Sequence, residues 1–166
     1  MLFAAATVNF TYSGLYRSEG GISSWTFIDF NDALVQEVEV TGPKGQLLLV
    51  TSSQGLHRST DNGDNWDLLA TFPSYNLATH PKGHVYVLRW EQSQPVLYFS
   101  SKYGQELTKT TFSGWPQALF LRENTNLYIS REEEGGILRS ANQGLYWSRE
   151  EQGFSASRVM QLVHDD

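Results

Sequence analysis

The stretch "STDNGDNW" occupies residues 59–66 and combines three turn-forming residue types with a tryptophan. Asp and Asn cap turns by hydrogen bonding to nearby backbone, and Gly adopts positive φ without steric cost. A tryptophan that becomes buried contributes a large apolar area, and its indole N–H then needs one partner. The stretch is therefore predicted to be a tight turn that a tryptophan anchors to the rest of the molecule.

A calcium-binding loop is the main alternative for this stretch, and the spacing argues against it. An EF-hand loop needs oxygen ligands at its first, third and fifth positions, Gly at the sixth and Glu at the twelfth. Counted from Asp61, the third, fifth, sixth and twelfth positions hold Gly63, Asn65, Trp66 and Phe72. We therefore expect no calcium site here.

The frame Ser-x-Asp-x-Gly-x-x-Trp recurs along the chain. It fits "SANQGLYW" at 140–147 well, "SSKYGQEL" at 100–107 less well and "SEGGISSW" at 18–25 loosely. The four frames end at residues 25, 66, 107 and 147, so their intervals are 41, 41 and 40 residues. The residues that keep the frame are Ser18, Trp25, Ser59, Asp61, Gly63, Trp66, Ser100, Gly104, Ser140, Asn142, Gly144 and Trp147. Such regular spacing indicates an internal repeat.

Short β-rich runs flank every frame. The runs just before the serines are "GLYRS" at 14–18, "GLHRS" at 55–59, "VLYFS" at 96–100 and "GILRS" at 136–140. Two further apolar or alternating runs lie upstream, turn signals separate them, and no window has a useful helical period. Each unit thus reads as four short strands, which is the content of one β-propeller blade. The predicted fold class is all-β, a propeller of four four-stranded blades of about 41 residues each.

The predicted blade boundaries use both ends of the chain. Blade 1 combines 157–166 with 1–30, and blades 2, 3 and 4 are 31–72, 73–112 and 113–156. The segment "SRVMQLVHDD" at 157–166 resembles an innermost strand, whereas the first unit lacks one. We expect these ends to pair, which hides two sheet edges that would otherwise invite aggregation. The pairing can occur within one chain, or between two chains as a homodimer with an eight-bladed ring.

The frame and its spacing resemble the Asp-box, or BNR, repeat of sialidases and sortilin-type receptors. The resemblance implies that each box forms the hairpin between the third and fourth strands of a blade, at its outer edge. It also implies that the Asp61 carboxylate binds backbone N–H groups, that Gly63 has positive φ and that Trp66 packs between blades. Asn142 can replace the aspartate, but Lys102 and Gly20 cannot, so weaker turns are expected in the first and third units.

Composition narrows the classes of function. The net charge is −6 and only four scattered lysines occur, which argues against nucleic-acid binding. The absence of cysteine excludes disulfides, zinc thiolate sites and a cysteine nucleophile. No apolar run approaches the length of a membrane span, and the N-terminus lacks the features of a secretory signal. We therefore expect a location in the cytoplasm or a virion rather than secretion.

Catalytic constellations are weak, so the expected protein is no enzyme and has no cofactor or metal. Sialidases use three arginines for the substrate carboxylate, but Arg17, Arg58 and Arg139 share one repeat position and would be spread around a ring. Their recurrence indicates a structural role that covers an outer strand. His80 and His84 are predicted on the two sides of a hairpin. The carboxylates of Glu37 and Glu39 are predicted on a solvated strand face.

Candidate binding residues lie in the loops that form the ligand-binding face of propellers. The candidates are Tyr12, Arg89, Trp90, Trp115 and Arg131, because aromatic and arginine side chains in loops suit protein or glycan binding. The same loops hold Asp29 and Asp32. Alternatively, the two tryptophans simply pack between blades.

The preferred function is a non-catalytic scaffold or protein-binding module. The alternatives are a carbohydrate-binding or sialidase-like glycosidase fragment, and a component of a larger assembly such as a phage particle.

Overall fold

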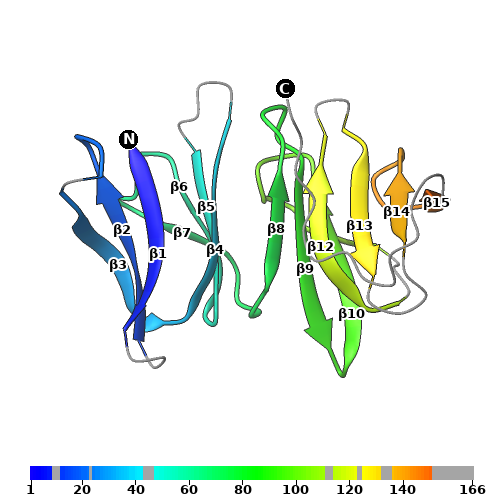
Figure 1. Ribbon diagram of the computed structural model, residues 1–166, viewed down its shortest axis with the longest axis horizontal. Coiled ribbons are helices and arrows are strands. Elements are labelled where there is room, and N and C mark those ends of the chain that lie inside the picture. The colour runs from blue at the N-terminus through cyan, green and yellow to red at the C-terminus, as the bar shows by residue number, and fades with distance from the viewer. Residues whose placement is uncertain are drawn as a thin grey trace. The chain divides into compact units, whose positions relative to one another are not determined.

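A computed structural model describes residues 1–8, 12–22, 24–42, 47–110, 114–122, 125–131 and 136–150 of the chain (Figure 1). The described part is all-β, as predicted, and its strands form antiparallel sheets. The chain divides into two compact units, Met1–Leu77 and Ala78–Asp166. The predicted innermost strand at 157–166 lies outside the described residues, and the predicted division into blades remains a prediction.

The first unit contains two sheets in which consecutive strands are neighbours. The first sheet has three described strands, β1 (Leu2–Val8), β2 (Tyr12–Ser18) and β3 (Thr26–Ala33). The second sheet has four, β4 (Val35–Thr41), β5 (Leu47–Ser52), β6 (Gly55–Ser59) and β7 (Asp67–Ala70).

Two further four-stranded sheets follow. The third sheet contains β8 (Asn76–Thr79), β9 (Val85–Glu91), β10 (Gln94–Ser100) and β11 (Thr108–Thr110), and the sequence boundary between the units falls within β8. The fourth lies in the second unit and contains β12 (Pro116–Leu121), β13 (Leu127–Arg131), β14 (Ile137–Ser140) and β15 (Ser148–Glu150).

Each unit has a hydrophobic core between its sheets. In the first unit Leu15, Phe30 and Val50 are buried together with Ala33 and Val35, and Trp66 packs against them. In the second unit the core contains Ala78, Tyr86, Leu88, Leu97, Leu127 and Ile129. The four consecutive residues of β9 from Val85 to Leu88 are at most 2% exposed. A continuous apolar run of this kind is expected for a strand that is covered on both faces.

Candidate functional site

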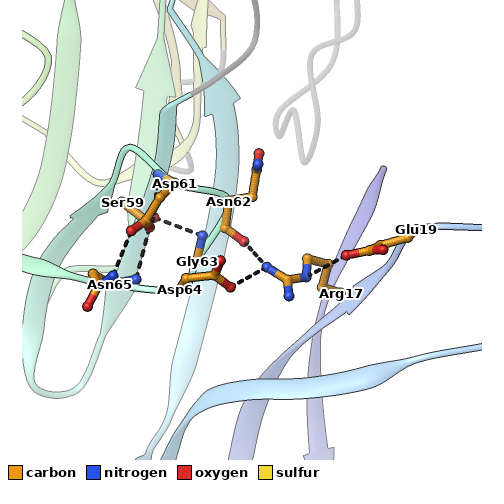
Figure 2. A network of polar contacts seen from close by, with 8 residues as sticks. All are labelled: Arg17, Glu19, Ser59, Asp61, Asn62, Gly63, Asp64 and Asn65. Carbon is orange, nitrogen blue, oxygen red and sulfur yellow. Dashed lines mark hydrogen bonds and ion pairs between the residues drawn. The ribbon is translucent and has the colours of Figure 1, made fainter.

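The turn at 59–66 is held by the side chains of Ser59, Asp61 and Asn65 (Figure 2). The hydroxyl of Ser59 accepts from the backbone N–H of Gly63 at 2.8 Å and donates to Asp61 Oδ1 at 2.8 Å. Asp61 Oδ1 also accepts from the backbone N–H of Asn65 at 2.9 Å, and Asp61 Oδ2 accepts from the Asn65 side chain at 2.8 Å. Hydrogen bonds from the Asn65 side chain and backbone and from Ser59 lower the pKa of Asp61 to about 2. The φ of Gly63 is 92°, so the predicted geometry of this turn is confirmed.

The turn at 140–147 repeats this arrangement with an amide in place of the carboxylate. Asn142 Oδ1 accepts from the Ser140 hydroxyl at 3.0 Å and from the backbone N–H of Tyr146 at 2.9 Å. The backbone N–H of Gly144 donates to Ser140 Oγ at 2.9 Å. Asn142 therefore replaces the aspartate as predicted.

The two degenerate turns use a different bond. The hydroxyl of Ser18 donates to the carbonyl of Gly21, and the hydroxyl of Ser100 donates to the carbonyl of Gln105. In both turns the serine hydroxyl therefore donates to a backbone carbonyl, whereas Ser59 and Ser140 donate to the side chains of Asp61 and Asn142.

Both well-formed turns pack on the preceding sheet of their own unit. A Cβ on Gly63 would lie 3.2 Å from Ile28 of β3, and a Cβ on Gly144 would lie 3.2 Å from Thr110 of β11. The Trp66 ring lies edge-to-face with Phe30, with ring centroids 5.0 Å apart. These contacts show that the two turns help to join neighbouring sheets.

The three repeated arginines also make structural contacts. Arg17 reaches the next turn, where its Nη1 donates to Asn62 O at 2.9 Å and to Asp64 Oδ1 at 2.7 Å (Figure 2). Arg58 pairs with Asp67 of β7 at 2.8 Å, and Arg139 pairs with Glu150 of β15 at 3.7 Å. The last two contacts cover outer strands, whereas Arg17 links one sheet to the next.

Two of the predicted binding residues meet in the second unit, and a third lies beside the segment that carries one of them; Trp90 and Arg131 belong to strands β9 and β13 and not to the predicted loops. The rings of Trp90 and Trp115 have centroids 4.8 Å apart and an interplanar angle of 38°. Arg131 is paired with Pro116, and its Cδ lies 3.0 Å from the position that a Cβ on Gly114 would take. Trp115 is 45% exposed although it contacts Trp90. We call Trp90, Trp115 and Arg131 the tryptophan ledge.

The other two predicted binding residues are not part of the ledge. Arg89 precedes Trp90 in β9, and successive side chains of a strand point to opposite faces. Its Nε lies 3.6 Å from Glu91 Oε1, and Glu91 also pairs with Lys109 at 2.8 Å. The bond from Lys109, followed by one from Tyr98, lowers the pKa of Glu91. Tyr12 begins β2 in the first unit, and its side chain lies outside the described part of the structure.

Glu37 contradicts the expectation of a solvated strand face. Its Oε2 accepts a hydrogen bond of 2.5 Å from the backbone N–H of Leu77. Burial raises the pKa of Glu37 to about 7, against the opposing effect of the Leu77 bond. Alternation with Val38 and Val40 places Glu37 on the face opposite these apolar side chains, but Val40 is 49% exposed and Leu77 of β8 contacts the Glu37 carboxylate. A register shift between Val35 and Glu37 also interrupts the alternation along β4.

The histidine pair also differs from its prediction. His80 and His84 flank the turn, but their ring centroids are only 6.0 Å apart, so the hairpin does not separate the two rings. The backbone N–H of His80 donates to the carbonyl of His84 at 2.9 Å, which closes the turn. The described residues contain no group of three or more His, Cys, Asp or Glu side chains that could hold a metal ion.

Similarity to solved structures identifies the class of fold. The sequence matches no family model, and no curated protein is significantly similar to it. Two structures of YCF48, one from Cyanidioschyzon merolae and one bound to a D1 peptide, are 15% and 13% identical, with TM-scores of 0.59 and 0.57. Both cover 70% of this chain, which spans 37% and 39% of theirs.

Two other structures extend the comparison. A chain from a nidogen/laminin complex has a TM-score of 0.67 at 14% identity and covers 82% of this chain, which spans 56% of it. A GH74 enzyme of Niastella koreensis has a TM-score of 0.59 at 19% identity and covers 88% of this chain, which spans 23% of it. The chain therefore spans between 23% and 56% of these four structures. These similarities and the antiparallel sheets indicate a β-propeller fold. No described helix is long and apolar enough to cross a membrane.

Proposed function

We propose that the chain is a non-catalytic β-propeller module that binds a protein partner through the tryptophan ledge. The observation that carries this proposal is the exposure of Trp115, which keeps 45% of its surface accessible while Trp90 supports its ring. Tryptophan and arginine are enriched among residues that dominate protein interfaces, and a ring already held in place loses little conformational entropy on binding. Arg131 lies beside the same segment, because it pairs with Pro116.

The structural neighbours add support of a general kind. One YCF48 structure is bound to a D1 peptide, and another neighbour comes from a nidogen/laminin complex. Propellers of this shape thus occur in proteins that bind proteins. A fold alone does not determine function, so the proposal depends on the ledge.

Replacement of Trp115 tests the proposal. The immobilised protein should capture a partner from an extract of its source cells, and Trp115→Ala and Arg131→Ala should each reduce capture of that same protein at least tenfold, as expected for a central interface residue. Tyr146→Ala is the matched control, because Tyr146 is 77% exposed in a turn of the same unit and should leave capture unchanged.

The same variants separate binding from packing. Thermal unfolding of Trp115→Ala should remain close to that of the unchanged protein, because nearly half of the ring is already in water. If the variant unfolds early, or if capture survives in both ledge variants, the tryptophans serve packing and the proposal fails. Turnover of an aryl-glycoside panel would instead favour a glycosidase, the alternative to which the GH74 neighbour points.

We also propose that the repeats are Asp-boxes and that the ring is completed by chain ends. Strand β1 has β2 on one edge and no described strand on the other, so it offers an unpaired edge for residues 157–166. The donor is either the same chain, which gives four blades, or a second copy, which gives eight.

Solution mass by light scattering distinguishes the two closures. We expect a mass near 18.8 kDa for closure within one chain or near twice that value for a two-chain ring. A concentration-dependent mixture of larger species would show that the β1 edge stays open and would contradict both.

A further inference from the structure

A cleft of about 190 Å³ lies in the first unit where its two sheets meet. It is lined by residues 29–32 of β3, by Gln54 and His57 of the hairpin that joins β5 to β6, and by Trp66. Clefts for drug-sized ligands hold about 300–1,000 Å³, so this one suits a single side chain or a group of similar size.

An irregularity in β3 creates the cleft. Ser13 pairs with Ala33 and Leu15 pairs with Asp29, so one residue of β2 faces three residues of β3. Residues 30–32 face Gly14 alone, so β3 carries two extra residues here, and Phe30 takes a φ of 70° that is uncommon for an aromatic residue. Bulges re-aim side chains and are frequent next to functional sites.

Aromatic side chains form a fixed wall of the cleft. The Phe30 ring lies edge-to-face with both His57 and Trp66, with centroid distances of 4.9 Å and 5.0 Å. Phe30 is buried, so this wall belongs to the core. Burial lowers the pKa of His57, against the opposing effects of the Gly55 backbone and the Asp29 charge. Its Nδ1 is buried and has no hydrogen-bond partner among the described residues.

The charged lining is entirely acidic. Asp29 and Asp32 supply two carboxylates, and none of the described residues that line the cleft is Lys or Arg. Asp29 Oδ1 accepts from the Phe30 backbone N–H at 2.7 Å, which orients that carboxylate. Carboxylates are acceptors, an ammonium or guanidinium group is purely a donor, and aromatic rings attract cations.

We propose that this cleft binds the cationic side chain of a lysine or arginine residue in a protein partner. The alkyl stem would lie along Phe30 and Trp66, and the charged group would meet Asp29 and Asp32. A neutral sugar could also contact amides and aromatic rings, but it would leave the two carboxylates without a counter-charge. The net charge of −6 on the chain favours the approach of a basic segment. This site is separate from the tryptophan ledge.

The test uses small probes and the whole chain. The ¹⁵N-labelled protein is titrated with Nα-acetyl-lysine amide, whose side chain keeps its ammonium group. The signals of the Gln54 side chain, the Phe30 amide and the Trp66 indole are followed by NMR. N-acetyl-norleucine amide is the matched control probe, because it keeps an alkyl side chain but lacks the ammonium group. We expect saturable shifts with the lysine probe only, and weaker binding as salt is raised.

A variant localises the effect. Asp32→Asn should weaken binding of the lysine probe by roughly threefold to tenfold, because a charge-assisted contact at a partly exposed site becomes a neutral one. Glu106→Gln removes one carboxylate from the second unit and should leave binding unchanged. The proposal is overturned if the norleucine probe binds equally well, if the lysine probe causes no shifts up to its solubility limit, or if only neutral monosaccharides move these signals. Salt dependence in the unchanged protein keeps the test decisive if Asp32→Asn fails to fold.

Discussion

Among alanine substitutions at glycines of the described part, Gly55→Ala is expected to destabilise the protein most. Gly55 has a φ of 135°, and a Cβ built on it would lie 2.0 Å from the carbonyl oxygen of Ala70 in β7. The backbones of Gly55 and Ala70 are both paired within the second sheet, so neither can shift without breaking that pairing. A clash of this kind together with backbone strain costs on the order of 4 kcal/mol, at the upper end of single-substitution effects.

Urea unfolding of Gly55→Ala measures this cost directly. Gly20→Ala is the matched control, because a Cβ on Gly20 meets no atom within 4 Å. The control should unfold within about 0.5 kcal/mol of the unchanged protein, as surface substitutions usually do. Equal midpoints for the two variants would show that β6 and β7 do not approach each other as closely as the structure has them.

Replacement of Glu37 by glutamine is expected to stabilise the protein at neutral and alkaline pH. The pKa of Glu37 is raised from 4.5 to about 7 in the folded state, chiefly by burial. Between these values the folded protein keeps a proton that the unfolded chain has lost, so stability falls as pH rises from about 4.5 and levels off above about 7. The shift corresponds to a loss of about 3 kcal/mol at its end. Glutamine removes the charge and keeps an oxygen for the Leu77 N–H.

The measurement is the free energy of unfolding between pH 4 and 8.5. The difference between Glu37→Gln and the unchanged protein should be small at the acid end and should grow to its full value near pH 8. Glu106→Gln, which alters an exposed carboxylate paired with Lys102, should keep the pH dependence of the unchanged protein. Direct titration of the Glu37 carboxyl by NMR near its ordinary pKa would contradict the buried environment.

The ledge shows what loop position alone can predict. Trp90, Trp115 and Arg131 were expected in two sets of loops on one face, but Trp90 lies within β9 and Arg131 ends β13. The structure brings the two tryptophan rings together and pairs Arg131 with Pro116, next to Trp115. Arg89 was grouped with them by its position in sequence, but strand alternation sends it to the other face of β9. The exposed fraction of Trp115 depends on how much of its ring Trp90 covers. Trp90 is distant in sequence, so the residues around Trp115 do not predict this fraction.

The sequence by itself determined the strand content, the repeat and the turn chemistry, because these depend on contacts between residues close along the chain. Ser59, Asp61 and Gly63 need only one another and Asn65 to close their turn, and Asn142 serves in the same way near Ser140. Three features follow only from the tertiary structure: the burial of Glu37, the proximity of the two histidine rings and the cleft beside Asp29. Each of these depends on a register shift or on burial by residues distant in sequence, and one extra residue in a strand is enough to reverse which face a side chain takes.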